Sequence, residues 1–496
     1  MRTLPKLLSK TRIMRGYRCL KNLYLNIHSP ELEAKITPEQ QALFDQGNAV
    51  GEEARKYFPG GTLVDNKPWD FFGSLKKTRE LLAQQAPIIY EAAFEYQGCY
   101  ARADIIKYSP DTQRWKIYEV KSSTKVKEEH LADIGLQAWI IAHSGLPLEE
   151  ISVIHINPAC RYPNLENLFV TVDVTAQMRE KYPTVLPKVN QLFSTIKTDA
   201  VPLVKIGQHC LAPSECGFKD HCWKEAHVPD FSVLDLPNLK DKKWELFHQG
   251  IIEVSDPRIT ELNELQQRIV EVVKTGDRYL NLNVIIQSLS QWKFPLVFLD
   301  FETISPAIPR FLGTGPYMHV PFQFSVHRMD SLNERETHAE FLHLENSDPR
   351  PQLIPALLKA CDGEGSIVSY YGKFETDRIK EMAQVFPEHK VHLDSLCERI
   401  VDPLPLIREA IYDLKFHGSF SLKSVVPALL GEDQSYEGML IGNGGEAQRA
   451  YEEVLKPETS QVRRQELIQA SLEYCKKDTK VMVDLVNWLF TIKGTK

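Results

Sequence analysis

The feature that most constrains the fold is a succession of three β-rich segments early in the chain. Residues 88–97, 99–108 and 114–123 are rich in β-branched and aromatic side chains, and the polar stretch SPDTQ separates the second segment from the third. Such segments, bounded by turn residues, are typical of β-strands. The sequence therefore predicts three consecutive strands in this region.

Helical and apolar segments flank these strands. Apolar residues recur with helical spacing at 38–58, where a Pro-Gly-Gly sequence stops the helix, and again at 130–145. Residues 151–157 form a short apolar run typical of a buried strand. The predicted order is α-β-β-β-α-β. An amphipathic helix at 176–196 follows, and then a cysteine-rich stretch that ends at Trp223.

The C-terminal part of the chain has a different succession of elements. Four strands are predicted, at residues 296–304, 321–329, 338–344 and 366–372. Helical spacing dominates after Phe374 and ends in a long helix at about 463–490. This order predicts an α/β domain with a mixed sheet and a helical C-terminal half.

At 496 residues, the chain is longer than one hydrophobic core usually serves. We expect a first domain at residues 1–227 and a second at residues 293–496. Residues 228–292 are rich in Asp, Lys, Glu and Leu with helical spacing and contain no chemical motif. They are predicted to form a helical connector.

Composition and charge are those of an ordinary globular protein. The net charge of -7 argues against the strongly basic surface of many passive nucleic-acid binders, but clustered catalytic carboxylates also lower a net charge. The first residues lack the apolar core of a signal peptide, and no apolar run reaches the roughly 18 residues of a membrane span. We expect a soluble, cytoplasmic protein with no membrane partner.

The first candidate site lies on two of the predicted strands. Asp104, Glu119 and Lys121 form the pattern D-x14-E-x-K. Residues two apart on a strand face the same side, so Glu119 and Lys121 are expected to point into one site. Phosphodiester hydrolysis needs carboxylates that hold Mg²⁺ or Mn²⁺ and a cation that offsets developing charge. These three residues supply those groups.

In this pattern the chain resembles the PD-(D/E)xK nucleases, specifically the RecB-like branch that includes the CRISPR-associated iron-sulfur exonucleases. The resemblance implies a restriction-endonuclease-like fold, with Asp104 and Glu119 as metal ligands and Lys121 and Gln137 as further catalytic residues. Two positions depart from the pattern. Gly51 stands where relatives often have a metal-binding His, with Glu52 as a weak substitute, and Ile141 stands where a Tyr is expected.

Four cysteines form a second candidate site. Cys210, Cys216 and Cys222 follow one another at equal spacing, and Cys19 lies far upstream. Thiolates suit either Zn²⁺ or an iron-sulfur centre. The RecB-like resemblance implies a 4Fe-4S cluster that holds the ends of the first domain together. Two neighbouring histidines are expected beside the cluster or exposed, and five cysteines are expected to be buried small apolar residues: His209, His221, Cys99, Cys160, Cys361, Cys397 and Cys475.

The third candidate site lies in the C-terminal domain. Asp300 and Glu302 end a buried apolar strand, where two carboxylates are costly unless a metal compensates their charge. Glu375 begins a helix after a strand, and Asp478 lies on the last long helix. Four carboxylates from separate points of the chain suit two metal ions, which stabilise the attacking and leaving oxygens of an in-line displacement.

This set resembles the DEDD exonucleases of the RNase H-like fold. The resemblance assigns Asp300 and Glu302 to the first motif and Asp478 to the last. Tyr474, on the same helical face as Asp478, corresponds to the tyrosine that orients the attacking water. Glu375 is the best match to the second motif, with Asp377 as the alternative.

The fragments PFQFSVH and GSFSLKSVVPALL further resemble a bacterial family that fuses this exonuclease-like domain to a RecB-like nuclease. That resemblance covers nearly the whole chain. In the second fragment, Ser419, Ser421 and Lys423 have side chains suited to a phosphate backbone, although Ser and Lys near a helix start are also typical of helix caps and solvated charge.

Together these features predict a metal-dependent nuclease, a DNA exonuclease with two active sites that use Mg²⁺ or Mn²⁺. The expected partner is single-stranded DNA or DNA ends, and no protein partner is assigned. One alternative is a nucleic-acid-binding or complex-assembling protein whose N-terminal nuclease site has decayed, which Gly51 favours. Another is an RNA-processing exonuclease, since DEDD sites process both polymers and the chain has no aromatic and basic RNA-binding motif to decide.

Overall fold

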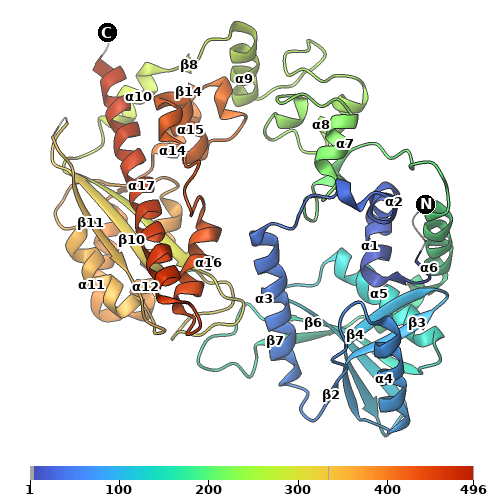
Figure 1. Ribbon diagram of the computed structural model, residues 1–496. Helices are drawn as coiled ribbons and strands as arrows, with labels where there is room; N and C mark the ends of the chain where they lie inside the picture. The colour runs from blue at the N-terminus through green and yellow to red at the C-terminus, as the bar shows by residue number, and fades with distance from the viewer. Residues whose placement is uncertain (1–4, 333, 495–496) are drawn as a thin grey trace. The chain divides into compact units, whose positions relative to one another are not determined.

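The computed structural model describes residues 5–332 and 334–494 as a mixed α/β protein (Figure 1). Its contacts divide the chain into two compact units. Unit 1 contains residues 1–227 and the short pieces 307–309 and 315–317, and unit 2 contains the rest, including the predicted connector.

Unit 1 is built on a seven-stranded mixed sheet with the strand order β2-β3-β4-β5-β6-β7, to which β1 adds by pairing with β4. The β3-β4, β4-β5 and β6-β7 pairs are antiparallel, whereas β5 and β6 are parallel. The strands are β1 Leu8–Ser9, β2 Thr62–Leu63, β3 Ile88–Tyr96, β4 Cys99–Ser109, β5 Arg114–Lys121, β6 Leu148–Ile156 and β7 Phe169–Asp173. The four predicted strands are confirmed.

The helices of unit 1 differ from the prediction at the N-terminus. They are α1 Lys10–Arg18, α2 Leu20–His28, α3 Pro38–Arg55, α4 Phe71–Ala83, α5 Glu128–His143, α6 Thr175–Ile196 and α7 Lys219–Glu225. The expectation that one helix precedes the strands is wrong, because α1, α2 and α4 also do. These helices are short or polar on one side and gain stability by packing, which local spacing does not report. The main core lies between the sheet, α1, α5 and α6.

Unit 2 contains a five-stranded mixed sheet with the order β11-β10-β9-β12-β13. The central strand β9 is antiparallel to β10 and parallel to β12. A separate pair joins β8 to β14. The strands are β8 Tyr279–Leu280, β9 Leu296–Ile304, β10 Val320–Met329, β11 Thr337–Leu342, β12 Ile367–Val368, β13 Ile400–Val401 and β14 Ile411–Tyr412.

The strand predicted at 366–372 is shorter than expected, because Tyr371 adopts a left-handed backbone with φ 65° and turns the chain into α12. The long last helix is confirmed and runs along the five-stranded sheet (Figure 1). The helices of unit 2 are α8 Lys242–His248, α9 Glu264–Thr275, α10 Leu282–Leu289, α11 Arg350–Ala360, α12 Lys373–Val385, α13 Lys390–Glu398, α14 Pro403–Ala410, α15 Leu422–Leu430, α16 Gly444–Leu455 and α17 Gln461–Gly494.

Across the part of the chain that the structure describes, no helix combines the length and apolar character that crossing a membrane requires.

Candidate carboxylate and cysteine sites

The C-terminal carboxylates start from β9, the central strand of the sheet. The alternation of LVFLDFETI buries its apolar side chains and places Asp300 and Glu302 on one face. Across the β9-β10 ladder, Asp300 pairs with Ser325 and Glu302 pairs with Gln323. Gln323 donates through Nε2 to the carbonyl oxygen of Ser471 at 2.8 Å, which fastens α17 against this strand pair.

All five predicted side chains of this site come together. They line one cavity of about 390 Å³, with Asp300 and Glu302 from β9, Glu375 from the first turn of α12, and Tyr474 and Asp478 from α17. The alternative residue for the second motif does not line this cavity, because Asp377 is partly exposed and forms an ion pair with Lys373 at 2.7 Å.

The start of α12 is fixed by a turn that aims Glu375 into this cavity. The Asp402 carboxylate accepts from the backbone nitrogens of Tyr371 and Gly372, both at 3.0 Å. A side chain at Gly372 would meet Ile400 at 2.9 Å, so this position requires glycine. Glu375 follows in the first helical turn, where the helix dipole favours a carboxylate.

The cavity concentrates negative charge in a poorly solvated place. Burial, with nearby Asp478 and Glu302, raises the pKa of Asp300 well above its ordinary value, and burial likewise raises the pKa values of Glu302 and Asp478. Burial raises the pKa of Glu375 to about 7. Buried carboxylates at this density are unfavourable without a compensating cation.

The donor set fits a hard divalent cation. Oxygen ligands suit Mg²⁺ and Mn²⁺, and Glu375 Oε2 is buried without a hydrogen-bond partner. Cys475 Sγ also lies with the carboxylate oxygens of Asp300 and Glu302, all within 4.8 Å of one another. Burial raises the pKa of the Cys475 thiol well above its ordinary value, so it packs beneath the carboxylates as a neutral group.

Two further residues of this site have no place in the predicted motif. The Tyr436 hydroxyl donates to Asp478 Oδ1, and Lys423 Nζ lies 3.0 Å from the Tyr474 hydroxyl. Tyr436 lies in the segment between α15 and α16, which has no sequence signature. Lys423 also lines a neighbouring cavity of about 430 Å³ together with Ser419, whereas Ser421 is the N-cap residue of α15 and pairs with Ser424.

The N-terminal carboxylates lie on the two strands where the sequence places them. Asp104 lies on β4, Glu119 and Lys121 lie on β5, and Gln137 faces them from α5. Asp104 Oδ2 accepts from the backbone nitrogen of Val120 at 2.7 Å, which ties it to the Glu119 strand.

Glu119 is surrounded by donors. Its Oε1 accepts from Lys121 Nζ at 2.6 Å and from Lys10 Nζ at 3.0 Å. Its Oε2 accepts from Gln137 Nε2 at 2.6 Å. Asp133 on α5 contacts both lysines. Lys10 and Asp133 escaped the sequence prediction because each comes from a segment without a nuclease motif.

The electrostatics differ from those of the C-terminal cavity. Burial alone would raise the pKa of Glu119, but the Lys10 and Lys121 ammonium groups outweigh burial and hold this pKa well below its ordinary value. Burial and the Glu119 charge raise the pKa of Asp104. Because two ammonium groups and an amide already surround Glu119, the charge of the residues as arranged does not fit a divalent cation.

The departures from the family pattern have structural counterparts. A Cβ added at Gly51 on α3 would meet nothing within 4 Å, so there is open space where the resemblance leads one to expect a His. Glu52 is exposed, and Ile141 is fully buried in the core of unit 1.

The four predicted cysteines line one small cavity in unit 1. Cys19 ends α1, Cys210 ends a 3-10 turn, Cys222 lies on α7, and Asn22 Nδ2 donates to Cys216 Sγ at 3.1 Å. Burial raises the pKa of the Cys19 and Cys210 thiols, and that of Cys222 to about 11. Four converging sulfur atoms fit a thiolate-bound metal or cluster, which would deprotonate them.

The remaining cysteines and histidines have simpler surroundings. His209 lines the cysteine cavity, and His221 lies 3.5 Å from Glu225. Cys397 is only half-buried, contrary to expectation, because it lies near the exposed end of α13. The other four of these cysteines are buried as predicted.

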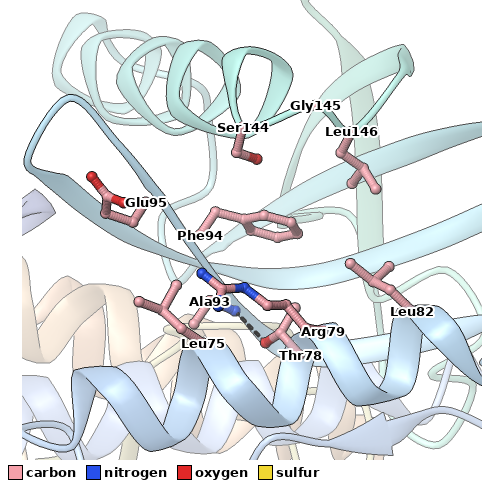
Figure 2. A pocket seen from close by; sticks show the side chains of 10 residues that line it. All are labelled: Leu75, Thr78, Arg79, Leu82, Ala93, Phe94, Glu95, Ser144, Gly145 and Leu146. Atoms are coloured by element: carbon pink, nitrogen blue, oxygen red, sulfur yellow. Dashed lines mark hydrogen bonds between the residues drawn. The ribbon is translucent and has the colours of Figure 1, made fainter.

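A further cavity of unit 1 contains none of the predicted residues. Figure 2 shows it between α4, β3 and the turn at residues 144–146, with a volume of about 220 Å³. Its lining is largely apolar, and Thr78 Oγ1 accepts from the backbone nitrogen of Ala93 at 2.9 Å. It offers no cluster of chemically active groups.

Comparison with protein families gives a match in the C-terminal part of the chain. Residues 297–421 match the family described as Domain of unknown function (DUF2779). The matched stretch contains Asp300, Glu302 and Glu375 and ends before Tyr474 and Asp478. No curated protein matches the chain.

Proposed function

We propose that this protein is a metal-dependent nuclease that hydrolyses phosphodiester bonds at the C-terminal carboxylate cavity. The observation that carries the proposal is the convergence of Asp300, Glu302, Glu375, Tyr474 and Asp478 on one cavity, with one buried carboxylate oxygen unpartnered. A strand, a short helix and the last long helix each supply part of this set, so the cavity depends on the fold of the whole unit.

The residues have distinct roles in this proposal. Asp300, Glu302, Glu375 and Asp478 would hold Mg²⁺ or Mn²⁺, which would supply Lewis-acid stabilisation of the attacking and leaving oxygens. Burial and the surrounding carboxylates raise the pKa of Tyr474, so its hydroxyl stays protonated and orients water by hydrogen bonding. Tyr436 holds Asp478 in place, and Lys423 adds positive charge beside Tyr474.

Degradation of single-stranded DNA by the full chain with Mn²⁺ tests this proposal. Asp300→Asn is expected to lower the rate by at least about 100-fold, because it removes a charged metal ligand. Asp377→Asn is the matched control, since it removes a partly exposed carboxylate outside the cavity and is expected to leave the rate unchanged. Equal rates for Asp300→Asn and the parent would rule out this cavity as the nuclease site.

The proposed substrate is single-stranded DNA or DNA ends, with RNA as the alternative. Competition between DNA and RNA oligonucleotides of one sequence, at equal concentration, separates the two. Preferential loss of the RNA strand would reassign the enzyme to RNA processing.

The finer fold assignment is also a proposal. We infer a restriction-endonuclease-like fold for unit 1 and an RNase H-like fold for residues 293–496. The mixed central sheets, with the Asp104 and Glu119 strands adjacent in one and the Asp300 strand central in the other, support it.

We infer that the cysteine cavity holds a 4Fe-4S cluster. Cys19, Cys210, Cys216 and Cys222 come from separate segments and line one small cavity, which supports a centre bound by four thiolates. Anaerobically purified protein is expected to contain iron and to absorb broadly in the visible range. A colourless protein with stoichiometric zinc would overturn the assignment.

A second candidate function is favoured by the hydrogen bonds that Glu119 already accepts from Lys10, Lys121 and Gln137. In it, the chain binds nucleic acid or assembles a complex, and its N-terminal nuclease site has decayed. This candidate predicts that the full chain binds an oligonucleotide in the presence of a chelator. It also predicts that the chain does not cleave the oligonucleotide, whichever divalent metal is added. Cleavage by the parent that disappears in Asp300→Asn excludes it.

A further inference from the structure

The N-terminal carboxylates are neutralised by a lysine outside the family motif. Lys10 Nζ lies 3.0 Å from Glu119 Oε1 and 3.1 Å from Asp133 Oδ1. Lys121, the lysine of the motif, contacts the same two carboxylates. Each ammonium group therefore bridges both acids, and the Lys10 side chain is only 24% exposed.

The backbone before Lys10 fixes where this side chain begins. Strand β1 pairs with β4, the strand of Asp104, and the Leu8 nitrogen donates to the carbonyl oxygen of Gly98 at 2.8 Å. Ser9 is the N-cap of α1 and accepts from the backbone nitrogen of Arg12. Lys10 is the first residue of that helix, so it is not a loose surface lysine.

The other end of α1 is fixed at the cysteine cavity. Cys19 follows the helix, and Arg18 Nε donates to the carbonyl oxygen of His209 at 2.6 Å. Gly16 packs so closely on α6 that an added Cβ would lie 2.6 Å from Leu192. The helix thus connects the cysteine cavity directly to the carboxylate site.

An ammonium group and a divalent cation compete for the same carboxylate oxygens. The ammonium group donates hydrogen bonds to these oxygens, the cation needs them as ligands, and the two positive charges repel each other. We propose that Lys10 is the internal counter-ion of the N-terminal site: it takes the place of a divalent cation beside Glu119, and its removal opens the site to Mn²⁺. This inference concerns metal binding in unit 1, so its test does not depend on nuclease activity at the C-terminal cavity.

Mn²⁺ binding to the full chain, followed by the electron paramagnetic resonance signal of free Mn²⁺, tests the proposal. All proteins carry Asp300→Asn and Glu302→Gln, so that the C-terminal cavity does not take up the ion. Adding Lys10→Met is expected to create a Mn²⁺ site that is roughly 10-fold or more tighter than any in the background protein. Lys10→Arg keeps the positive charge and is expected to create none.

Two controls identify the site. Lys116→Met removes another lysine of unit 1, one that pairs with Glu150 and does not contact Glu119, and it is expected to leave Mn²⁺ binding unchanged. Adding Asp104→Asn to Lys10→Met is expected to abolish the new site. Mn²⁺ binding that survives Asp104→Asn, or no gain in Lys10→Met, would overturn the proposal.

Folding of Lys10→Met is checked by circular dichroism. If the variant is unfolded without metal, the proposal requires Mn²⁺ to restore its structure. The ion would then compensate the negative charge of Glu119 and Asp133 that Lys10 no longer balances. Failure of Mn²⁺ to restore a structure that Lys10→Arg retains would contradict it.

Discussion

Glu375 shows at the level of one residue how a buried carboxylate site opposes stability. Its carboxylate is buried with one oxygen unpartnered, and burial raises its pKa from 4.5 to about 7. The folded state therefore binds this proton more tightly than the unfolded state. The contribution of protonated Glu375 to the free energy of unfolding is fully present below about pH 4.5 and is lost as the pH rises through about 7.

We expect the metal-free protein to lose unfolding free energy between about pH 4.5 and about pH 7, in part through Glu375. Glu375→Gln removes that part, on the order of 3 kcal/mol at most. Urea unfolding in the presence of a chelator, at several pH values across this window, measures this contribution, with Asp377→Asn as the control at a partly exposed carboxylate. A pH dependence identical in Glu375→Gln and the parent would contradict the expectation.

At the level of elements, α1 packs closely on α6 because Gly16 has no side chain. A Cβ there would lie 2.6 Å from Leu192 and 2.9 Å from Leu23. Both leucines are buried in the main core of unit 1, so neither can move without repacking its neighbours. The close approach of α1 and α6 is what brings Lys10 and Cys19 to their sites.

Gly16→Ala is therefore expected to lower the free energy of unfolding by about 1–3 kcal/mol through overpacking, although alanine favours helices. Gly47→Ala is the matched control. It lies on α3, where an added Cβ meets nothing within 4 Å, so it is expected to stabilise by up to about 1 kcal/mol. Thermal unfolding compares the two variants, and an unchanged midpoint for Gly16→Ala would show that the core accommodates the methyl group.

At the level of the whole molecule, each unit has its own sheet and its own core. Separate cores are the basis of independent unfolding. The cysteine cavity belongs to unit 1 and the C-terminal cavity to unit 2. Disruption of one site therefore need not unfold the unit that contains the other site.

Calorimetry is expected to resolve two unfolding transitions. Ile151→Ala empties a fully buried position on β6 and Leu299→Ala one on β9, and each is expected to cost its own unit about 2–5 kcal/mol. Each variant should lower the midpoint of one transition only. A single transition lowered equally by both variants would show that the two units unfold together.

The parts of the fold and of the candidate sites that depend on local periodicity were predictable from sequence. The two-residue period of a strand places Asp300 with Glu302 and Glu119 with Lys121 on one face, and the four-residue spacing of a helix places Tyr474 with Asp478. These relations are set within a few residues, so they do not depend on distant contacts.

Tertiary structure alone decided which distant segments complete each site. Lys10, Asp133 and Tyr436 have no motif, and they reach the carboxylates only because strand pairing and helix packing bring their segments there. The outcome is opposite at the two sites. In the C-terminal cavity the buried carboxylates keep an oxygen without a partner, whereas in the N-terminal site a lysine 109 residues from Glu119 in sequence supplies the neutralising charge. Sequence specified the carboxylates, and the fold specified what compensates them.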